Sequence, residues 1–93
     1  MSTELFESVW DALGDTPTEA ENMKLRSSLM IAITEAVSAW HVTPMEAARR
    51  LGVTQPHLND LLRGRIDKFS LDALVALAAR AGLAVRMEIT KAA

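Results

Sequence analysis

A short polar run carries the side chains best suited to chemistry in this 93-residue chain. Between positions 54 and 59, hydroxyl, amide and imidazole groups can donate or accept hydrogen bonds, and most of them are uncharged. Groups of this kind can recognise the edges of nucleic-acid bases in a groove. We therefore predict four base-reading residues: Thr54, Gln55, His57 and Asn59.

Basic side chains follow this polar run at once. Arg63, Arg65 and Lys68 fall within six positions, in a stretch that is expected to be a loop. A basic loop in this place is suited to gripping phosphate oxygens, and such contacts supply affinity and orientation rather than sequence preference. We add Thr43, at the start of a predicted helix, to the predicted phosphate contacts.

Turn-forming residues divide this region into two short helices. The Thr43–Pro44 pair can begin the first, because threonine caps a helix N-terminus and proline there loses only an N–H without a helical partner. Gly52 can adopt the left-handed conformation that ends this helix. Thr54 can cap the second helix, with Pro56 in its first turn and Gly64 after its end.

Each of these predicted helices has one apolar face. Ala47 and Ala48 share a face of the first helix and are small enough to let another helix cross closely. Leu58, Leu61 and Leu62 have the spacing of a buried stripe on the second. Two such helices around a glycine turn are typical of a helix-turn-helix, whose second helix enters the major groove of DNA. The alternative is an αα-hairpin within an ordinary helical bundle.

The run EAARRLGVTQPHLNDLLRGRIDKFSLDAL, at positions 46–74, resembles the helix-turn-helix of the phage-repressor-like (XRE) superfamily. More narrowly, its Gly-Val-Thr-Gln-Pro turn and its later Phe-Ser-Leu are similar to those of HigA-type antitoxins. VWDALGDTP, at positions 9–17, is also similar, so the resemblance covers about Phe6 to Ile89. It implies a lambda-repressor-like domain that represses transcription at a double-stranded DNA operator. It further implies the antitoxin of a type II toxin–antitoxin operon, which autoregulates and neutralises a RelE-like mRNA-cleaving toxin.

The chain departs from this family pattern in two places. Pro44 stands at a position that is usually glutamine, so a phosphate contact from that amide is absent. His57 and Asn59 stand where arginine and serine are common. Two other functions stay open: a stand-alone XRE regulator of phage-like origin, and a helical adaptor that does not bind DNA. A small basic protein encoded beside this one would favour the antitoxin, whereas the net charge of only +2 over residues 43–69 keeps the adaptor open.

Composition excludes several classes of protein. The chain has no cysteine, which excludes disulfides and thiolate metal sites. No apolar run approaches the ~18–20 residues of a membrane span, and the N-terminus lacks the basic start of a signal peptide, so we expect a cytoplasmic protein without a membrane partner. His41 and His57 are the only histidines and no catalytic or phosphate-loop motif is present. We therefore expect no enzyme, cofactor, metal or small-molecule substrate.

Residues 1–15 are predicted to form an acidic, amphipathic N-terminal arm. Phe6, Val9, Trp10 and Leu13 recur at helical spacing, and residues 1–22 carry a net charge of −6 against +4 for the remainder. The apolar side of this arm is expected to dock on its own domain or, alternatively, on a basic toxin.

The remaining segments complete a mostly α fold of about five helices, with the helix-turn-helix domain at 16–82. A long helix capped by Thr16 is expected to run to about Trp40, and a final helix capped by Ser70 is expected at 71–81. The long helix is expected to bury one main row of side chains: Leu25, Leu29, Ile33, Val37 and Trp40.

In residues 83–93 the spacing of apolar side chains changes from the helical period of the preceding segments to a period of two. Apolar and polar side chains alternate there, as in a strand with one buried face, and no second strand is predicted elsewhere in the chain. An isolated strand leaves its backbone unpaired, so we predict one C-terminal β-strand that pairs with the same strand of a second copy in a homodimer. The predicted dimerisation residues are Leu83, Val85, Met87 and Ile89.

Overall fold

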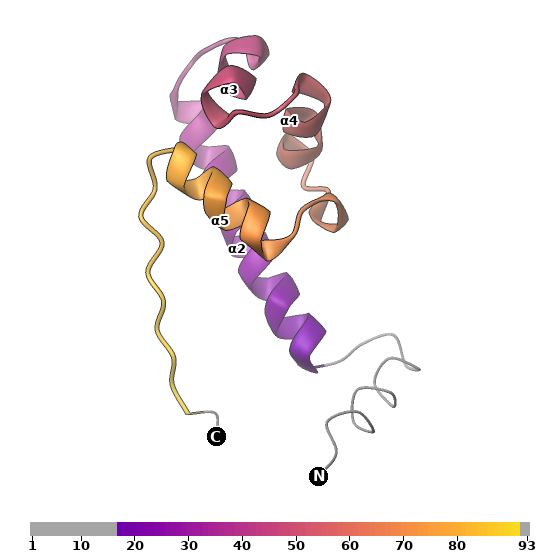
Figure 1. The fold of residues 1–93 in the computed structure, drawn as a ribbon, viewed down its shortest axis with the longest axis vertical. Coiled ribbons are helices and arrows are strands. Elements are labelled where there is room, and N and C mark those ends of the chain that lie inside the picture. Colours follow the sequence, from indigo (N-terminus) through magenta and orange to yellow (C-terminus); the bar gives the residue numbers. More distant parts are fainter. Residues whose placement is uncertain (1–16, 92–93) are drawn as a thin grey trace.

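The computed structural model describes residues 17–91, in which four α-helices surround one core (Figure 1). The helix α2 is the long one, and α5 lies along it. The short helices α3 and α4 pack against each other at one end of this pair, and the 3₁₀ helix η1 follows α4. Their bounds are α2 Pro17–Ala39, α3 Pro44–Leu51, α4 Gln55–Leu62, η1 Ile66–Lys68 and α5 Leu71–Arg80. The predicted arm at 1–15 and the Thr16 cap lie outside the described residues.

Hydroxyl caps begin the three short α-helices, as the sequence predicts. Thr43 Oγ1 accepts from the N–H of Glu46 at 3.2 Å, and Thr54 Oγ1 accepts from the N–H of His57 at the same distance. Ser70 Oγ accepts from the third residue of α5 at 3.1 Å. Each cap satisfies an N–H that has no partner inside its helix, which fixes where the helix starts.

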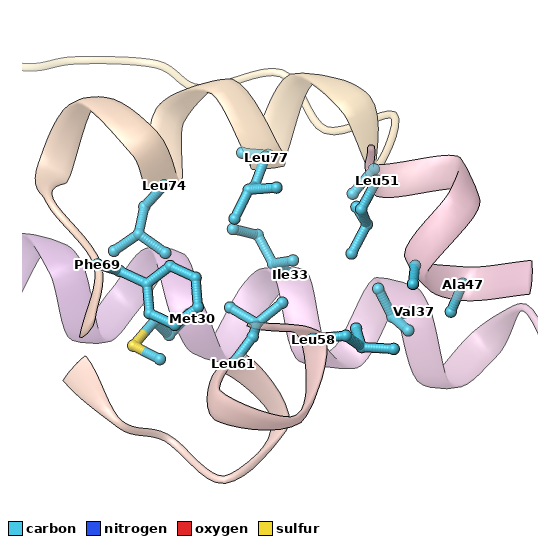
Figure 2. Packing of buried hydrophobic residues seen from close by; sticks show 13 residues of the cluster. Met30, Ile33, Val37, Ala47, Leu51, Leu58, Leu61, Phe69, Leu74 and Leu77 are labelled. Carbon is cyan, nitrogen blue, oxygen red and sulfur yellow. The ribbon is translucent and has the colours of Figure 1, made fainter. Parts of the chain in front are cut away.

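Large aliphatic side chains from four helices fill the core, as Figure 2 shows. The largest fully buried residues are Ile33, Leu51, Leu58, Leu61 and Leu74. Ala47 and Ala48 are also buried, so the predicted close approach of α3 to its neighbours is confirmed. The helices α3 and α4 are therefore packed against α2 and α5 through one shared core.

The predicted buried row of α2 is wrong at its N-terminal end. Leu25 is 52% exposed, whereas Met30, beside that row, is buried. Figure 1 shows the first turns of α2 extending past α5. Ile33 and Val37 are buried as predicted, and Leu29 and Trp40 are partly buried against the core.

The predicted C-terminal strand is not present in the described residues. After Gly82 the chain is extended through residue 91 but forms no β-ladder, because the single chain offers no neighbouring backbone with which to pair (Figure 1). Leu83 packs against the core, and its N–H donates to the carbonyl of Ala78 at 2.9 Å. Beyond it the apolar side chains are largely exposed: Val85 50%, Met87 82% and Ile89 84%.

Candidate nucleic-acid interface

The exposed face of α4 presents two amide side chains one turn apart. Gln55 is the first residue of the helix and Asn59 lies four positions later, so both project from the same side. Leu58 and Leu61 point inward and are almost completely buried, which fixes the rotation of the helix. The structure therefore brings together two of the four predicted base-reading residues on an outward face.

Thr54 lies at the N-terminal edge of this face. Its hydroxyl oxygen accepts the capping hydrogen bond from His57 N–H, but the hydroxyl hydrogen can still be donated to a ligand. Thr54 therefore combines a structural role with one available donor.

His57 does not share the face of the other three residues. Its ring is half-buried and stacks on Phe69, with ring centroids 4.3 Å apart and an interplanar angle of 28°. Phe69 is only 3% exposed, so this contact turns the imidazole toward the segment after α4. A stacking partner 12 positions away cannot be inferred from helical spacing, and base reading by His57 stays a prediction.

The predicted phosphate-binding residues differ in whether they already form ion pairs or hydrogen bonds within the chain. Arg63, at the C-cap of α4, and Lys68, at the end of η1, are exposed and form no ion pair among residues 17–91. Arg65 instead contacts Asp60, with Nη1 3.2 Å from Oδ1. Thr43 is exposed at the N-terminus of α3, where its hydroxyl oxygen is occupied by the cap.

The turn between α3 and α4 depends on a left-handed glycine. Gly52 has a φ of 69° and ψ of 34°, and its N–H donates to the carbonyl of Arg49 at 3.1 Å. Val53 then packs against the core, and its N–H donates to Ala48 at 3.0 Å. These bonds satisfy the last carbonyls of α3 and reverse the chain within two residues, which brings α4 across α3.

Comparison with protein families supports this geometry. A family model described as a helix-turn-helix domain matches residues 12–90 of the chain. The chain belongs to this helix-turn-helix family. Comparison with curated proteins finds no match. The helix-turn-helix domain supports DNA as the partner and a DNA-binding regulator as the class of protein. None of the helices within residues 17–91 is both long and apolar enough to span a bilayer.

A carboxylate on α3 holds two arginines of the helix-turn-helix unit. Arg49 donates to both oxygens of Glu46, at 2.8 and 2.6 Å, and Arg50 donates to Oε2 at 2.9 Å. These hydrogen bonds, with that of Arg49 the largest cause, lower the pKa of Glu46 to about 2. Arg50 also lies over the ring of Trp40, 5.2 Å from its centroid. Both arginines are therefore engaged within the domain before any ligand arrives.

Arg26 is a residue whose role sequence reasoning missed. The sequence most simply predicts a solvated side chain, although in repressor-like folds the start of this helix can approach phosphate. In the structure, Arg26 Nη1 donates to the carbonyls of Ile66 and Phe69, at 3.1 and 3.4 Å. Its Nε donates to Asn22 Oδ1 at 2.7 Å, a helical i,i−4 contact that orients the guanidinium. The Asn22 spacing is visible in the sequence, whereas bonds across 40 positions leave no sequence signal.

Proposed function

We propose that this protein is a homodimeric, sequence-specific repressor that acts by binding an operator and performs no catalysis. The observation that carries the proposal is the pair Gln55 and Asn59, which stand exposed one turn apart on α4 while the opposite side of that helix is buried in the core. Amides of this kind form bidentate hydrogen bonds with adenine in the major groove. Thr54 adds a hydroxyl donor at the helix start.

Phosphate contacts in this proposal come first from Arg63 and Lys68. Both are exposed and lie just after the recognition helix, where the duplex backbone passes when α4 occupies the groove. Arg65 joins them only by exchanging Asp60 for a phosphate. Thr43 supports the backbone contact at the start of α3, where helix N–H groups favour an anion.

The experiment is binding of the full chain to a duplex that carries the upstream region of its own gene, against unrelated DNA, over a salt series. Gln55→Ala is expected to lower discrimination by ~1–3 kcal/mol at one base pair. Lys68→Ala is expected to weaken binding to all DNA sequences alike and to reduce the slope of log affinity against log salt concentration (the salt slope) by about 1. Lys24→Ala removes the same charge from an exposed position near the start of α2 and serves as the control.

Two results would contradict this assignment. If Gln55→Ala and Lys68→Ala lost affinity evenly across sequences, the division between base reading and phosphate binding would be wrong. If the unchanged protein showed no preference for its upstream region, the adaptor function would replace the repressor.

Dimerisation is proposed through the extended segment after Gly82. Val85, Met87 and Ile89 alternate along it and are at least half exposed, and its backbone forms no ladder in the single chain. A second copy paired antiparallel would bury these side chains and supply the missing backbone partners. Two subunits would also present two recognition helices to half-sites about 34–36 Å apart.

Sedimentation at micromolar concentration tests the dimer. Ile89→Asp is expected to shift the protein toward monomer, because it places a charge in the paired face. Thr90→Asp, on the alternate face of the same segment, is the matched control and should leave the mass unchanged. A monomeric wild type would contradict the pairing.

The antitoxin role is the finer part of the proposal. The resemblance of residues 46–74 to HigA-type antitoxins supports it, together with the acidic composition of residues 1–22, which suits a basic toxin. Co-expression with the product of an adjacent gene tests it: a stable complex that relieves growth arrest is expected. A repressor that binds its operator but has no such partner would be the stand-alone regulator.

A further inference from the structure

Arg26 fixes both ends of the segment that follows the recognition helix. Its Nη1 donates to the carbonyl of Ile66, the first residue of η1, and to that of Phe69, the residue after η1. Its guanidinium is oriented by Asn22 on the preceding turn of α2. One side chain of the scaffold helix therefore spans the whole 3₁₀ turn.

This turn connects Lys68, of the proposed DNA-binding surface, to the buried ring of Phe69 that packs on α4. Lys68 is its last residue and is exposed without an ion pair among residues 17–91. Phe69 follows directly, is buried, and stacks on His57 in the first turn of α4. Because Arg26 holds the backbone between them, the position of Lys68 relative to α4 depends on a residue of α2.

The side chain at this position needs the geometry of arginine. A guanidinium has several N–H donors fixed in one plane, so it can serve Asn22 and two carbonyls together. A lysine ammonium can reach one of these acceptors but cannot hold the three in the same arrangement. Removing the donor would leave the carbonyls of Ile66 and Phe69 without this partner and allow η1 to loosen.

We propose that Arg26 is a positioning residue for DNA binding, which acts through the backbone of residues 66–69 to hold Lys68 where it meets a phosphate. The inference rests on the proposed function for its binding readout, and on the contacts of Arg26 alone for its structural readout. It assigns to α2 a part in DNA affinity without any contact between Arg26 and the duplex.

The experiment compares Arg26→Met, Arg26→Lys and Lys24→Met in the full chain, with the upstream duplex and a salt series. Arg26→Met is expected to weaken binding by roughly tenfold and to lower the salt slope by about 1, as if one phosphate contact were lost. Arg26→Lys should recover part of the affinity. Lys24→Met removes an exposed charge on the same helix, whose ion pair within residues 17–91 is with Glu21 at 3.6 Å, and should leave the slope unchanged. An unchanged slope in Arg26→Met would overturn the proposal.

A double variant separates positioning from direct contact. In the Lys68→Ala background, Arg26→Met should cause no further fall in the salt slope, because the contact that Arg26 positions is already absent. A further fall would show that Arg26 itself neutralises a phosphate, and would overturn the proposal.

Amide hydrogen exchange tests the same inference without DNA. The N–H groups of Lys68 and Phe69 donate to Arg65 and Ile66, at 3.0 and 3.2 Å, and close η1. Arg26→Met should accelerate exchange at these two amides while the amide of Ile33, in the core, keeps its protection. Unchanged exchange at Lys68 and Phe69 would overturn the proposal that Arg26 holds η1 in place. A wild-type protein that shows no preference for its upstream DNA would instead overturn the proposed function alone.

Discussion

Replacing Gly52 by alanine should destabilise the protein more than the same change at Gly64. Both glycines have φ near 70°, in the left-handed region, so an alanine at either site costs ~1–2 kcal/mol in backbone conformation. The loss of chain entropy from the unfolded state offsets about 0.4–1 kcal/mol of that at both sites. Their surroundings differ: within residues 17–91, a Cβ at Gly64 meets no atom within 4 Å, whereas a Cβ at Gly52 meets the guanidinium of Arg80, Nη1 first.

The Arg80 guanidinium can move, but only by giving up a bond. Its Nη1 donates to the carbonyl of Leu51 at 2.9 Å and so satisfies the C-terminal end of α3. A hydrogen bond from a charged donor contributes ~1.5–3 kcal/mol when buried, and this one is partly exposed, so we expect about 1–2 kcal/mol. Gly64→Ala should therefore cost about 1 kcal/mol or less. Gly52→Ala should cost about 2–3 kcal/mol, since it adds the loss of the Arg80 bond.

Urea and thermal unfolding measure this difference. At ~4–8 °C per kcal/mol for a domain of this size, Gly52→Ala should melt roughly 5–15 °C below Gly64→Ala. In an Arg80→Met background the difference between the two alanine variants should vanish, because no guanidinium remains to be displaced. Equal losses in the wild-type background, or a difference that persists without Arg80, would refute this account of the turn.

Two further variants test the electrostatics and the ring contact. Glu46→Gln should cost stability at neutral pH, and the cost should fade as the pH drops from about 4.5 toward 2, because a carboxylate whose folded pKa is lowered stabilises only while it stays ionised. Denaturant titrations across this range test it against Glu35→Gln, on the exposed side of α2, and a cost that is independent of pH would contradict it. His57→Ala should cost ~0.5–1.5 kcal/mol through the lost stacking on Phe69, and a changed preference in a panel of duplexes would show that His57 also reads bases. Unchanged stability of His57→Ala in the same denaturant titrations would contradict the stacking contribution.

The helix-turn-helix could be predicted from sequence because its signals are local. Caps at Thr43, Thr54 and Ser70 mark where helices begin, and the left-handed conformation predicted for Gly52 is the one observed. The hydrogen bonds of these caps and of the Gly52 N–H join residues three or four positions apart. Residue type and spacing therefore suffice to predict where the helices begin and end.

The errors concern contacts between distant segments. The expected burial of Leu25 followed from helical periodicity, which gives the face of a helix but not how far its neighbours extend. The alternation from Leu83 to Ile89 predicts a strand, but a strand forms only where another backbone lies alongside. The Arg26 and His57 contacts likewise depend on tertiary packing across 40 and 12 positions.

The number of basic residues in the sequence overstates how many cations of the helix-turn-helix are available to bind DNA phosphates. Five basic residues lie between positions 43 and 69, but Glu46 holds Arg49 and Arg50, and Asp60 holds Arg65. Because the Glu46 carboxylate stays ionised down to a pH near 2, a phosphate must compete with it for both arginines at neutral pH. Within residues 43–69, Arg63 and Lys68 are the cations that form no ion pair with the described part of the chain, so a phosphate can bind them without displacing a carboxylate. In the proposed function, sequence selectivity comes from the amides of α4, and a second subunit supplies further contacts with the duplex. The position of each remaining cation then matters more than the net charge, which is why the contact between Arg26 and η1 bears on affinity.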